Sequence, residues 1–576
     1  MPPLTETQQF RCARDLLIEC RSDYEQAHSR FEWPAFRRFN WAVDWFDHLA
    51  TVAGDRRALV VADATGPREA VTFAQMSARS DRAASWWYRA GVRRGDRVLL
   101  AMDNVVGIWE SVLAAMKLGA VVIPASPRLS EREFAERLSR GGARHVVCDT
   151  RTATRLDRIA EGTTSLVLSA PGDDVPPGWG SLADCGCELS GREFPVADTA
   201  PTDPLLAYFT SGTTSDPKLV RHNHGYPIGH LSTMYWIGLR PGDVHLNVAA
   251  PGWAKHLGSG LFAAWNAEAT VVVHRQERFS AAATLDVMER LKVTTVCAPP
   301  TAWRMLIQED LTRRSLALRE AVSAGEPLEA DVIEHVRRAV GVTVRDGYGQ
   351  TETTHVIGHS PGASVKLGSM GRPMPGFDVV LCNVRTGRAT TSGAMEVVVA
   401  PGQLGIMDGY DHGEGSTPAD QAPRHRTGDL ARRDEDGYLT YLGRLDDVFK
   451  ASGYRISPLE VERVLLEHPA VAEVAVVPSP DALRKWVPKA YVALASGWEP
   501  DRDTAWSILL HARSSLGRYK RIRRLTFGEL PKTVSGKVRR SELRLREGQR
   551  GDAPVRDEEI VEEWQDHEFE TASRPS

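Results

Sequence analysis

Short apolar runs alternate with amphipathic stretches along most of the first 345 residues. Continuous apolar segments at 97–101, 120–123 and 145–148 predict buried strands, and the stretches 108–118 and 131–140 between them predict helices. The same alternation returns from 271 to 345, with helices expected at 281–291, 301–309 and 330–340. Strands and helices that alternate at short intervals predict an α/β fold of mostly parallel sheets covered by helices.

The pattern changes twice toward the C-terminus. Short Gly- and Val-rich strands around 376–400 indicate a β-rich subdomain, and after 444 a smaller α+β pattern follows. That pattern has a helix at 458–467, strands at 472–477, 490–494 and 522–527, and a helix at 505–516. We therefore expect a large N-terminal domain at 1–445, a small C-terminal domain at 446–550 and a solvated, flexible acidic tail at 551–576.

Length, net charge and cysteine content limit the class of protein to which the chain can belong. A chain of 576 residues is too long for one core, and its net charge of −4 argues against a general nucleic-acid partner. Its seven cysteines are scattered apart from Cys185 and Cys187, which predicts reduced packing residues in a cytoplasmic protein. The first residues lack a signal-peptide pattern, and no apolar run approaches the ~20 residues of a membrane span, so none is predicted.

The segment from Leu205 to Lys218 combines an apolar strand with a turn of small hydroxyl residues that ends in Pro-Lys. Hydroxyl and backbone N–H donors, a glycine and a lysine are suited to phosphate oxygens. The segment lacks the ending and spacing of the common P-loop. An ordinary surface turn has the same composition, so this segment alone does not establish a phosphate site.

Four further segments have residue types suited to a nucleotide. The run from Asp346 to Glu352 is expected just after a strand and offers an aromatic ring, amide and hydroxyl groups, and a carboxylate for Mg²⁺. Asp429 follows a Thr-Gly pair and is suited to two ribose hydroxyls. Asp446 lies in a polar stretch at the domain junction, and Lys537 lies in a Ser-Gly turn near the end of the small domain. Each segment also has an ordinary reading as a turn, linker or solvated surface.

Taken in this order, the five segments resemble the adenylate-forming superfamily of AMP-binding enzymes, which includes acyl- and aryl-CoA synthetases. The resemblance covers roughly residues 30–548. Within the superfamily, medium-chain acyl-CoA and benzoate-type ligases are most similar at four stretches. These are 39–47, Pro251-Gly252-Trp253-Ala254-Lys255-His256, Cys297-Ala298-Pro299-Pro300-Thr301 and Ala324-Gly325-Glu326-Pro327.

The resemblance implies an acid–CoA ligase with ATP, Mg²⁺ and coenzyme A as cofactor and substrates. A carboxylate attacks the α-phosphate of ATP, and coenzyme A then attacks the acyl-adenylate after the small, mobile domain rotates. The implied nucleotide-binding positions are Thr210, Ser211, Gly212, Thr213, Thr214, Lys218, Gly325, Glu326, Pro327, Asp346, Gly347, Tyr348, Gly349, Gln350, Thr351, Asp429, Arg444 and Lys537.

Particular roles follow from the same resemblance. Lys537, Glu352 and Thr210 are the implied catalytic residues: Lys537 would bridge the carboxylate and the α-phosphate, and Glu352 would bind the metal. Asp446 matches the hinge, and Trp253 with the neighbouring stretch 254–265 would line the acid pocket. The implied coenzyme A contacts are Ser452, Gly453, Tyr454, Arg455 and Arg484.

The chain departs from the family pattern at several positions. Ser215 stands in the phosphate loop where glycine is usual, and Asp216 beside it would weaken ATP binding unless its side chain points away. The other departures are in the small domain, at Ser457, Lys485-Trp486 and Arg521-Ile522. They leave the acceptor of the second half-reaction open.

Alternative functions therefore remain at this point. The adenylate could pass to a carrier-protein thiol or an amine, or the chain could activate nitrite as diazo-forming relatives do. A nucleotide-binding scaffold without turnover is a third interpretation, and the presence of Lys537, Glu352 and Asp429 argues against it. Neither the particular acid nor the oligomeric state follows from the sequence.

Overall fold

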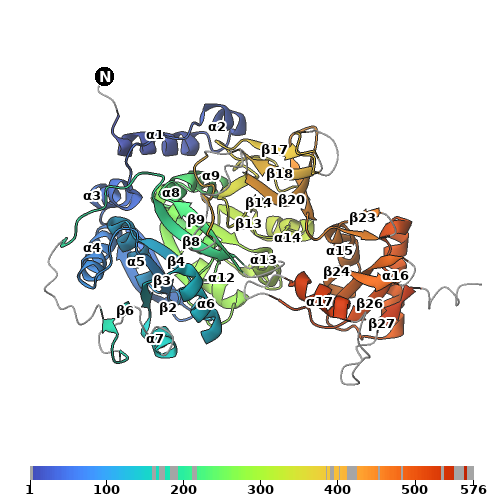
Figure 1. Cartoon of the computed structure of the whole chain (residues 1–576). Helices are drawn as coiled ribbons and strands as arrows, with labels where there is room; N and C mark the ends of the chain where they lie inside the picture. The colour runs from blue at the N-terminus through green and yellow to red at the C-terminus, as the bar shows by residue number, and fades with distance from the viewer. Residues whose placement is uncertain are drawn as a thin grey trace, which may run out of the picture.

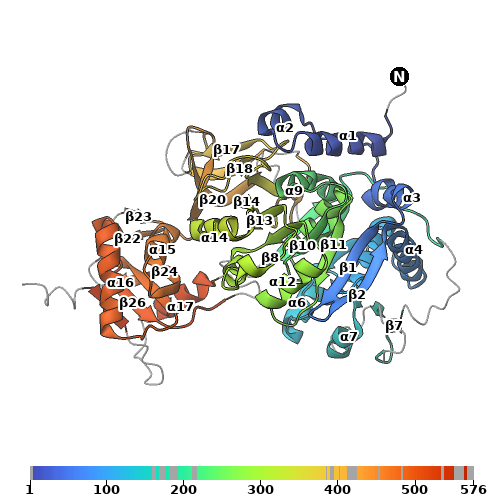
Figure 2. The ribbon, with the colours of Figure 1, turned by 180° about the vertical axis from the view of Figure 1, so that it is seen from behind.

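The computed structural model consists of a large N-terminal part and a small C-terminal domain that lies to one side of it (Figures 1 and 2). It describes residues 4–157, 164–167, 175–181, 192–210, 217–384, 386–389, 395–400, 403–411, 425–451, 454–481, 484–532, 538–549 and 563–566. The α/β fold expected from the sequence is confirmed, with two large sheets, a β-rich subdomain and a small α+β domain.

One large sheet has nine strands, and most of its central pairs are parallel. Its order is β16 (Arg372–Pro373), β15 (His355–Gly358), β14 (Val344–Gly349), β13 (Glu320–Ala324), β12 (Thr295–Ala298), β10 (Val244–Asn247), β11 (Thr270–His274), β1 (Arg57–Asp63) and β2 (Gly66–Thr72). Helices α12 (Ala281–Arg290), α13 (Pro300–Leu306) and α14 (Ala330–Val340) pack with it in one apolar cluster. The carboxyl ends of β12, β13 and β14 therefore share one edge.

The second large sheet has eight strands. Its order is β19 (Gly409–Asp411), β9 (Lys218–Asn223), β8 (Pro204–Thr210), β4 (Val121–Pro124), β3 (Arg97–Ala101), β5 (His145–Cys148), β6 (Thr164–Val167) and β7 (Gly180–Ser181). Helices α6 (Glu131–Gly141) and α7 (Thr150–Leu156) contribute to its outer cluster. Strands β8 and β9 form an antiparallel hairpin, and β19 adds to its edge, although it is almost 190 positions further along the chain.

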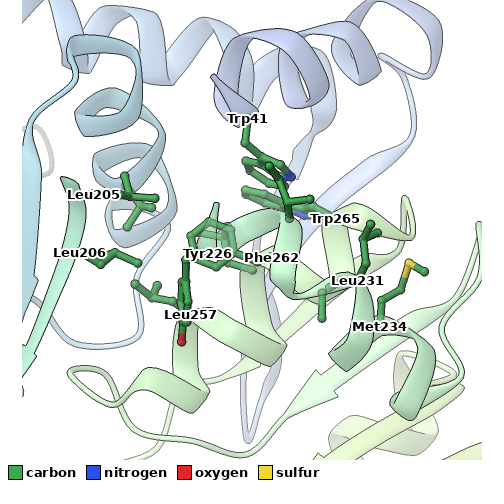
Figure 3. Packing of buried hydrophobic residues seen from close by; sticks show 14 of the residues in the cluster. Trp41, Leu205, Leu206, Tyr226, Leu231, Met234, Leu257, Phe262 and Trp265 are labelled. Carbon is green, nitrogen blue, oxygen red and sulfur yellow. The ribbon is translucent and has the colours of Figure 1, made fainter. Parts of the chain in front are cut away.

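The main core lies between these two sheets. Helix α5 (Gly107–Leu118) is buried along its length from Ile108, and α4 (Phe73–Arg89) packs beside it. Large aromatic side chains are part of this core. Trp41, Tyr226, Phe262 and Trp265 lie close together in Figure 3, and the rings of Trp41 and Phe262 pack edge-on with their centroids 5.4 Å apart. The other helices on this side are α1 (Glu6–Glu19), α2 (Tyr24–Arg30), α3 (His48–Val52), α8 (Tyr226–Gly229), α9 (Leu231–Ile237), α10 (Ala254–Leu257) and α11 (Ala264–Asn266), with π-helical turns at Trp41–Asp47 and Gly258–Ala263.

The β-rich subdomain is a four-stranded antiparallel sheet in the order β17 (Val379–Cys382), β18 (Met395–Val399), β20 (His425–Arg433) and β21 (Leu439–Arg444). It lies next to β14 in Figure 1. Strand β21 ends at Arg444, immediately before the expected domain junction.

The small domain begins with the β22 (Phe449–Ala451) and β23 (Tyr454–Ile456) pair. Helices α15 (Pro458–Leu466) and α16 (Arg502–Ser515) then pack in one apolar cluster with the sheet β24 (Val471–Asp481), β25 (Lys485–Leu494), β26 (Arg524–Phe527) and β27 (Glu563–Gln565), and α17 (Arg540–Gln549) contacts β24. Short 3₁₀ turns lie at Leu311–Arg313 and Arg518–Lys520.

Part of the tail differs from the solvated appendage expected from its acidic composition. Strand β27 pairs antiparallel with β26, and Trp564 is 9% exposed within the small-domain core. Asp566 forms ion pairs with Arg513 and Arg523, and Glu563 forms one with the buried Lys489. These acidic side chains are therefore partners of basic groups in the domain rather than solvated charges.

Two other properties bear on the sequence predictions. Cys12, Cys20, Cys148, Cys297 and Cys382 are free thiols; Cys185 and Cys187 lie outside the described residues. No helix in the described part of the chain is long and apolar enough to cross a membrane.

Candidate functional site

The expected phosphate segment occupies the β8–β9 hairpin. Thr210 ends β8 and is the register partner of Lys218, which begins β9, and the Thr210 hydroxyl lies 3.4 Å from the Lys218 carbonyl oxygen. The loop between them, 211–216, contains Ser211, Gly212, Thr213, Thr214 and the departures Ser215 and Asp216, and it lies outside the described residues. The hairpin thus brings together the two described ends of the segment.

The second segment, from Asp346 to Gly349, lies inside β14 rather than after it as the sequence suggested. The strand can continue because it pairs with β15, where Gly347 is opposite Gly358 and Gly349 is opposite His355. A Cβ on Gly347 would lie 2.4 Å from the indole of Trp236, so glycine is required for this close packing. Gln350, Thr351 and Glu352 then lie in the turn between the two strands.

Asp346 is almost fully buried at the base of this segment. Its Oδ1 accepts a hydrogen bond of 2.9 Å from the Gly347 backbone N–H, and its Oδ2 lies 3.4 Å from the Leu328 nitrogen. Burial raises its pKa to about 7, against the opposing effect of these N–H groups and of Lys255.

Asp429, on β20, is the centre of the site's polar network. Its Oδ2 accepts hydrogen bonds of 2.5 Å from both the Tyr348 hydroxyl and the Gln350 side-chain amide. Its Oδ1 lies 3.2 Å from the Tyr441 hydroxyl and 3.4 Å from an Arg444 guanidinium nitrogen. The network joins β14 of the nine-stranded sheet to β20 and β21 of the β-rich subdomain.

The charges of Asp429 and Arg444 depend on each other. Burial raises the pKa of Asp429, and Arg444 and the three hydrogen-bond donors oppose that rise. Burial disfavours the charged guanidinium of Arg444, yet the carboxylates of Asp429 and Asp446 raise its pKa overall. The buried carboxylate of Asp429 therefore lies within reach of the Arg444 guanidinium.

Gln350 and Thr351 are held by protein groups. The Gln350 amide also donates to the Thr427 carbonyl at 2.9 Å, and its Oε1 lies 3.2 Å from Nε2 of His425. The Thr351 carbonyl oxygen lies 2.7 Å from Nε2 of His222. Burial lowers the pKa of His222 to about 4, so at neutral pH its uncharged ring donates this bond.

Glu352 follows in the same turn and is tied to the segment 403–411. Its Oε1 accepts a hydrogen bond of 2.9 Å from the Tyr410 hydroxyl, and its carbonyl accepts one of 2.8 Å from the Met407 N–H. The Tyr410 ring lies beneath Lys218, whose ammonium is 4.8 Å from the ring centroid. The structure thus brings together Glu352 and Lys218, the expected metal and phosphate ligands.

The Gly325-Glu326-Pro327 segment follows β13 at the same sheet edge. Gly325 has a φ of +111°, a backbone conformation that residues other than glycine rarely adopt. Glu326 forms an ion pair of 3.9 Å with Arg304. Ala324, just before it, pairs with Gly347, so this segment lies beside the Asp346–Gly349 strand.

Trp253 precedes α10 and is half-buried, and its indole N–H has no hydrogen-bond partner among the described residues. A small, mostly apolar hollow beside it is lined by Leu100, Met102, Ile108, Pro124, Ala125, Pro251, Gly252, His256 and Leu257. Residues 258–265, in contrast, are buried in the core. Lys255 donates to the Ala324 carbonyl at 2.8 Å, which places a cation near Asp346.

The expected hinge residue Asp446 forms an ion pair of 3.1 Å with Arg444. Close to it, the Ser457 hydroxyl donates to the Leu442 carbonyl at 2.6 Å and so joins the start of α15 to β21. Arg463 of α15 also donates to the Tyr441 carbonyl at 3.2 Å. Ser457, one of the departures, is therefore a contact across the expected junction.

The expected coenzyme A residues are only partly described. Ser452, Gly453 and the side chain of Arg455 lie outside the described residues, and Arg484 is exposed. Tyr454 is 55% exposed and stacks on Tyr519 at 4.6 Å. Lys485, another departure, has a φ of +65°, a conformation that non-glycine residues seldom adopt.

Lys537 also lies outside the described residues, but both ends of its loop are described. Lys532 and Val538 form an antiparallel bridge. The pKa of Glu133 is lowered mainly by its hydrogen bond from the Ser130 backbone N–H, and the charge of Arg539 lowers it further. Glu133 is on α6, and Arg137 and Arg140 of that helix lie over Phe209 at the end of β8. Arg539, two residues after Lys537, therefore contributes to the electrostatic environment of α6.

Several residues of the site have no counterpart in the sequence motifs. Tyr410, Tyr441 and His425 contact motif residues through side chains that come from distant segments. An aromatic residue after a Gly in 409–410 is a weak signal on its own, and only the pairing of β19 with β9 places it at the site.

Comparisons with known proteins find relatives over most of the chain. The model of the family described as AMP-binding enzyme matches residues 46–410, and that of the AMP-binding enzyme C-terminal domain matches 460–537. The chain is 39% identical over 521 residues to 4-hydroxybutyrate–CoA ligase 1 of Metallosphaera sedula, covering 89% of this chain and 91% of that protein. It is 35% identical over 526 residues to the human mitochondrial acyl-coenzyme A synthetase ACSM5, covering 88% and 90%.

Solved structures of CoA ligases are also similar to this chain. The anthranilate CoA ligase AuaEII, solved in complex with anthranoyl-AMP, superposes with a TM-score of 0.80 at 28% identity, covering 90% of this chain and 99% of that one. A benzoate CoA ligase from Burkholderia xenovorans LB400 superposes with a TM-score of 0.75 at 26% identity, covering 88% of this chain and 100% of that one.

Proposed function

The chain belongs to the AMP-binding enzyme family and is an AMP-forming acid–CoA ligase, and we propose how its residues divide the reaction between them. The reaction uses ATP, Mg²⁺ and coenzyme A. A carboxylic acid first forms an acyl-adenylate with release of pyrophosphate, and coenzyme A then takes the acyl group and releases AMP. The names of the relatives favour this outcome over transfer to a carrier protein or amine, and over nitrite activation.

The observation that carries the assignment of residues is the network around Asp429. A buried carboxylate with a cation beside it is suited to the two vicinal hydroxyls of a ribose, because each carboxylate oxygen accepts one O–H. The Tyr348 hydroxyl and the Gln350 amide both donate to Oδ2 of this carboxylate. We assign ribose binding to Asp429 and Arg444, and adenine contact to Tyr348, its neighbours Asp346, Gly347 and Gly349, and the Gly325-Glu326-Pro327 segment.

We assign the phosphates to the β8–β9 hairpin. Lys218, Thr210 and the loop residues Ser211, Gly212, Thr213 and Thr214 would hold the β- and γ-phosphates, with Gln350 and Thr351 toward the α-phosphate. Lys537 would approach from the small domain and bridge the acid carboxylate and the α-phosphate. Two anions must meet in this step, and a lysine ammonium offsets their repulsion.

The residues present fit Mg²⁺ held mainly by the nucleotide. The described residues contain no group of three or more His, Cys, Asp and Glu side chains that could hold a metal ion, and Glu352 offers one carboxylate beside Lys218. Mg²⁺ is commonly bound by one or two carboxylates together with substrate phosphates and water. Bound there, Mg²⁺ would neutralise phosphate charge, and Glu352 would be its protein ligand.

For the second half-reaction we propose that the domains at 1–445 and 446–550 move about Asp446. Tyr454 and Arg484 are exposed on the small domain, where a nucleotide portion of coenzyme A can reach them together with Ser452, Gly453 and Arg455. The free thiols and the substrates ATP and coenzyme A support a cytoplasmic location.

We propose an aryl or medium-chain acid as the substrate. Relatives are named for 4-hydroxybutyrate, anthranilate and benzoate. The half-buried Trp253 and the apolar hollow beside it support an acid with an alkyl or aryl body.

Pyrophosphate release over a panel of acids, with nitrite included, tests this function. Thioester should form only when acid, ATP and coenzyme A are all present. Release of pyrophosphate without thioester would favour a different acceptor, and release with nitrite alone would favour diazo chemistry. A Lys537→Ala variant should lose most adenylate formation yet still convert supplied acyl-adenylate and coenzyme A to thioester; unchanged pyrophosphate exchange would remove Lys537 from its role.

A further inference from the structure

The segment 403–411 runs alongside the turn that carries Glu352. The Thr354 N–H donates to the Gly405 carbonyl at 2.9 Å, and the Met407 N–H donates to the Glu352 carbonyl at 2.8 Å. Thr353 and Ile406 form an antiparallel bridge between them. These backbone bonds fix the position of the Glu352 main chain and bring Tyr410 close to its side chain.

Tyr410 contacts the site through two different parts of its side chain. Its hydroxyl donates to Oε1 of Glu352 at 2.9 Å. Its ring faces the Lys218 ammonium, 4.8 Å from the centroid, within the range of a cation–π interaction. One side chain thus contacts both the proposed metal ligand and the proposed phosphate ligand.

The pairing of strands explains how Tyr410 reaches both groups. Tyr410 is the register partner of Val220 on β9, two residues beyond Lys218. Strand β19 therefore holds Tyr410 beside the first residues of β9, and the bridge at Ile406 holds the same segment against the Glu352 turn. A tyrosine phenol carries its proton at neutral pH, so the Tyr410 hydroxyl is the donor in its hydrogen bond with Glu352.

We propose that Tyr410 is a positioning residue for the nucleotide: its hydroxyl orients the Glu352 carboxylate for Mg²⁺, and its ring holds Lys218 in place for the phosphates. The inference rests on the proposed function, because it takes Glu352 and Lys218 as ligands of magnesium and phosphate. Hydrogen bonds to metal-ligating carboxylates fix their orientation, and their loss typically lowers metal affinity by about 10- to 100-fold.

The two contacts can be separated by substitution. Tyr410→Phe removes the hydroxyl and keeps the ring, so it should affect only the contribution of Mg²⁺ to nucleotide binding. Tyr410→Leu removes both, so it should also weaken binding without Mg²⁺, by roughly 2- to 5-fold for the loss of one exposed cation–π contact.

The experiment measures binding of α,β-methylene-ATP by calorimetry, in excess Mg²⁺ and in EDTA, with no acid present. Wild type should bind more tightly in Mg²⁺ than in EDTA. Tyr410→Phe should lose about 10-fold of that enhancement and match wild type in EDTA. In a Glu352→Gln background, Tyr410→Phe should have no further effect on the Mg²⁺ enhancement, because the hydroxyl acts through Glu352.

Tyr438 provides the matched control. It also has a lysine over its ring, with the Lys366 ammonium at 5.4 Å, but it lies outside the site. Tyr438→Phe and Tyr438→Leu should bind the analogue as wild type does. A Tyr410→Phe variant with the full Mg²⁺ enhancement, or one that still lowers it in the Glu352→Gln background, would overturn the inference. A wild-type protein that binds no nucleotide would instead overturn the proposed function.

Discussion

The phenolic hydroxyl of Tyr348 lies 2.5 Å from Oδ2 of Asp429, and the two residues come from different sheets, 81 positions apart. Tyr348 extends from the end of β14, and Asp429 lies on β20 of the β-rich subdomain. The bond satisfies one oxygen of a buried carboxylate, and Arg444 lies 3.4 Å from the other oxygen. Ribose hydroxyls can replace these donors with little cost, because each displaced hydrogen bond is exchanged for another.

Removal of the Asp429 carboxylate should therefore weaken AMP binding. Asp429→Ala loses two charge-assisted hydrogen bonds to the ribose and leaves Arg444 without its buried partner, so affinity should fall by about 100-fold or more. Calorimetric titration with AMP measures this. Asp436→Asn is the control, because that side chain is 72% exposed and forms an ion pair with Lys366, away from the site. Equal affinity of Asp429→Ala and wild type would exclude the ribose assignment.

Acid should destabilise the protein through its buried histidines. Burial lowers the pKa of His222, His224, His256 and His359 to about 4, and that of His245 and His355 to about 3. Their unfolded pKa is near 6.5, so the unfolded chain binds protons first as the pH falls below that value. Each histidine should then lower the free energy of unfolding by about 1.4 kcal/mol per pH unit down to its folded pKa.

Urea unfolding at pH 7.5, 6.0 and 5.0 measures this loss. His224→Gln should reduce the pH dependence, because the buried His224 no longer titrates, whereas the exposed His28→Gln should leave it unchanged. A stability that is constant from pH 7.5 to 5.0 would contradict the burial of these rings.

Local signals in the sequence account for most of the regular elements. Helix α6 begins where expected because Ser130 forms a capping box with Glu133, and α14 has the predicted bounds. Strands β24 and β25 are longer than their apolar runs. Their pairing continues beyond Val477, from the pair of Pro478 with Pro488 to the pair of Asp481 with Lys485. Tertiary pairing, which local sequence does not encode, sets those ends.

The site was predictable where its residues lie in one motif and not where they meet across sheets. Asp429, Tyr348 and Glu352 were named from the sequence, although the residues that hold them, Tyr410 and Tyr441, belong to no motif. The tail shows the same limit: its acidic composition predicted a solvated segment, but Asp566 pairs with Arg513 and Arg523 at least 43 positions away. Composition cannot show that a charge has a distant partner.

Trp564 should stabilise the small domain from outside the predicted domain boundary. It pairs with Leu525 across β26 and β27 and packs in the core of that domain, so Trp564→Ala should lower the free energy of unfolding by about 3 kcal/mol or more. Urea unfolding measures this free energy, and limited proteolysis locates the change in the small domain. Trp498→Ala is the matched control, since that tryptophan is 39% exposed. Equal effects of the two substitutions would argue against a structural role for β27.

Ser457 should slow the proposed domain rotation. Its hydroxyl donates to the Leu442 carbonyl at 2.6 Å, and a Cβ on the adjacent Gly443, which has a φ of +125°, would lie 2.9 Å from that hydroxyl oxygen. Movement about Asp446 would separate α15 from β21 and break this bond, which contributes roughly 0.5–1.5 kcal/mol. Ser457→Ala should therefore leave pyrophosphate release unchanged and accelerate thioester formation by about 2- to 10-fold, from the same energy range. Rapid quench of preformed acyl-adenylate with coenzyme A measures the second step alone. Ser457→Gly adds backbone freedom at the start of α15, so a rate increase in the glycine variant but not in the alanine variant would assign the effect to the backbone and contradict the role of the hydroxyl.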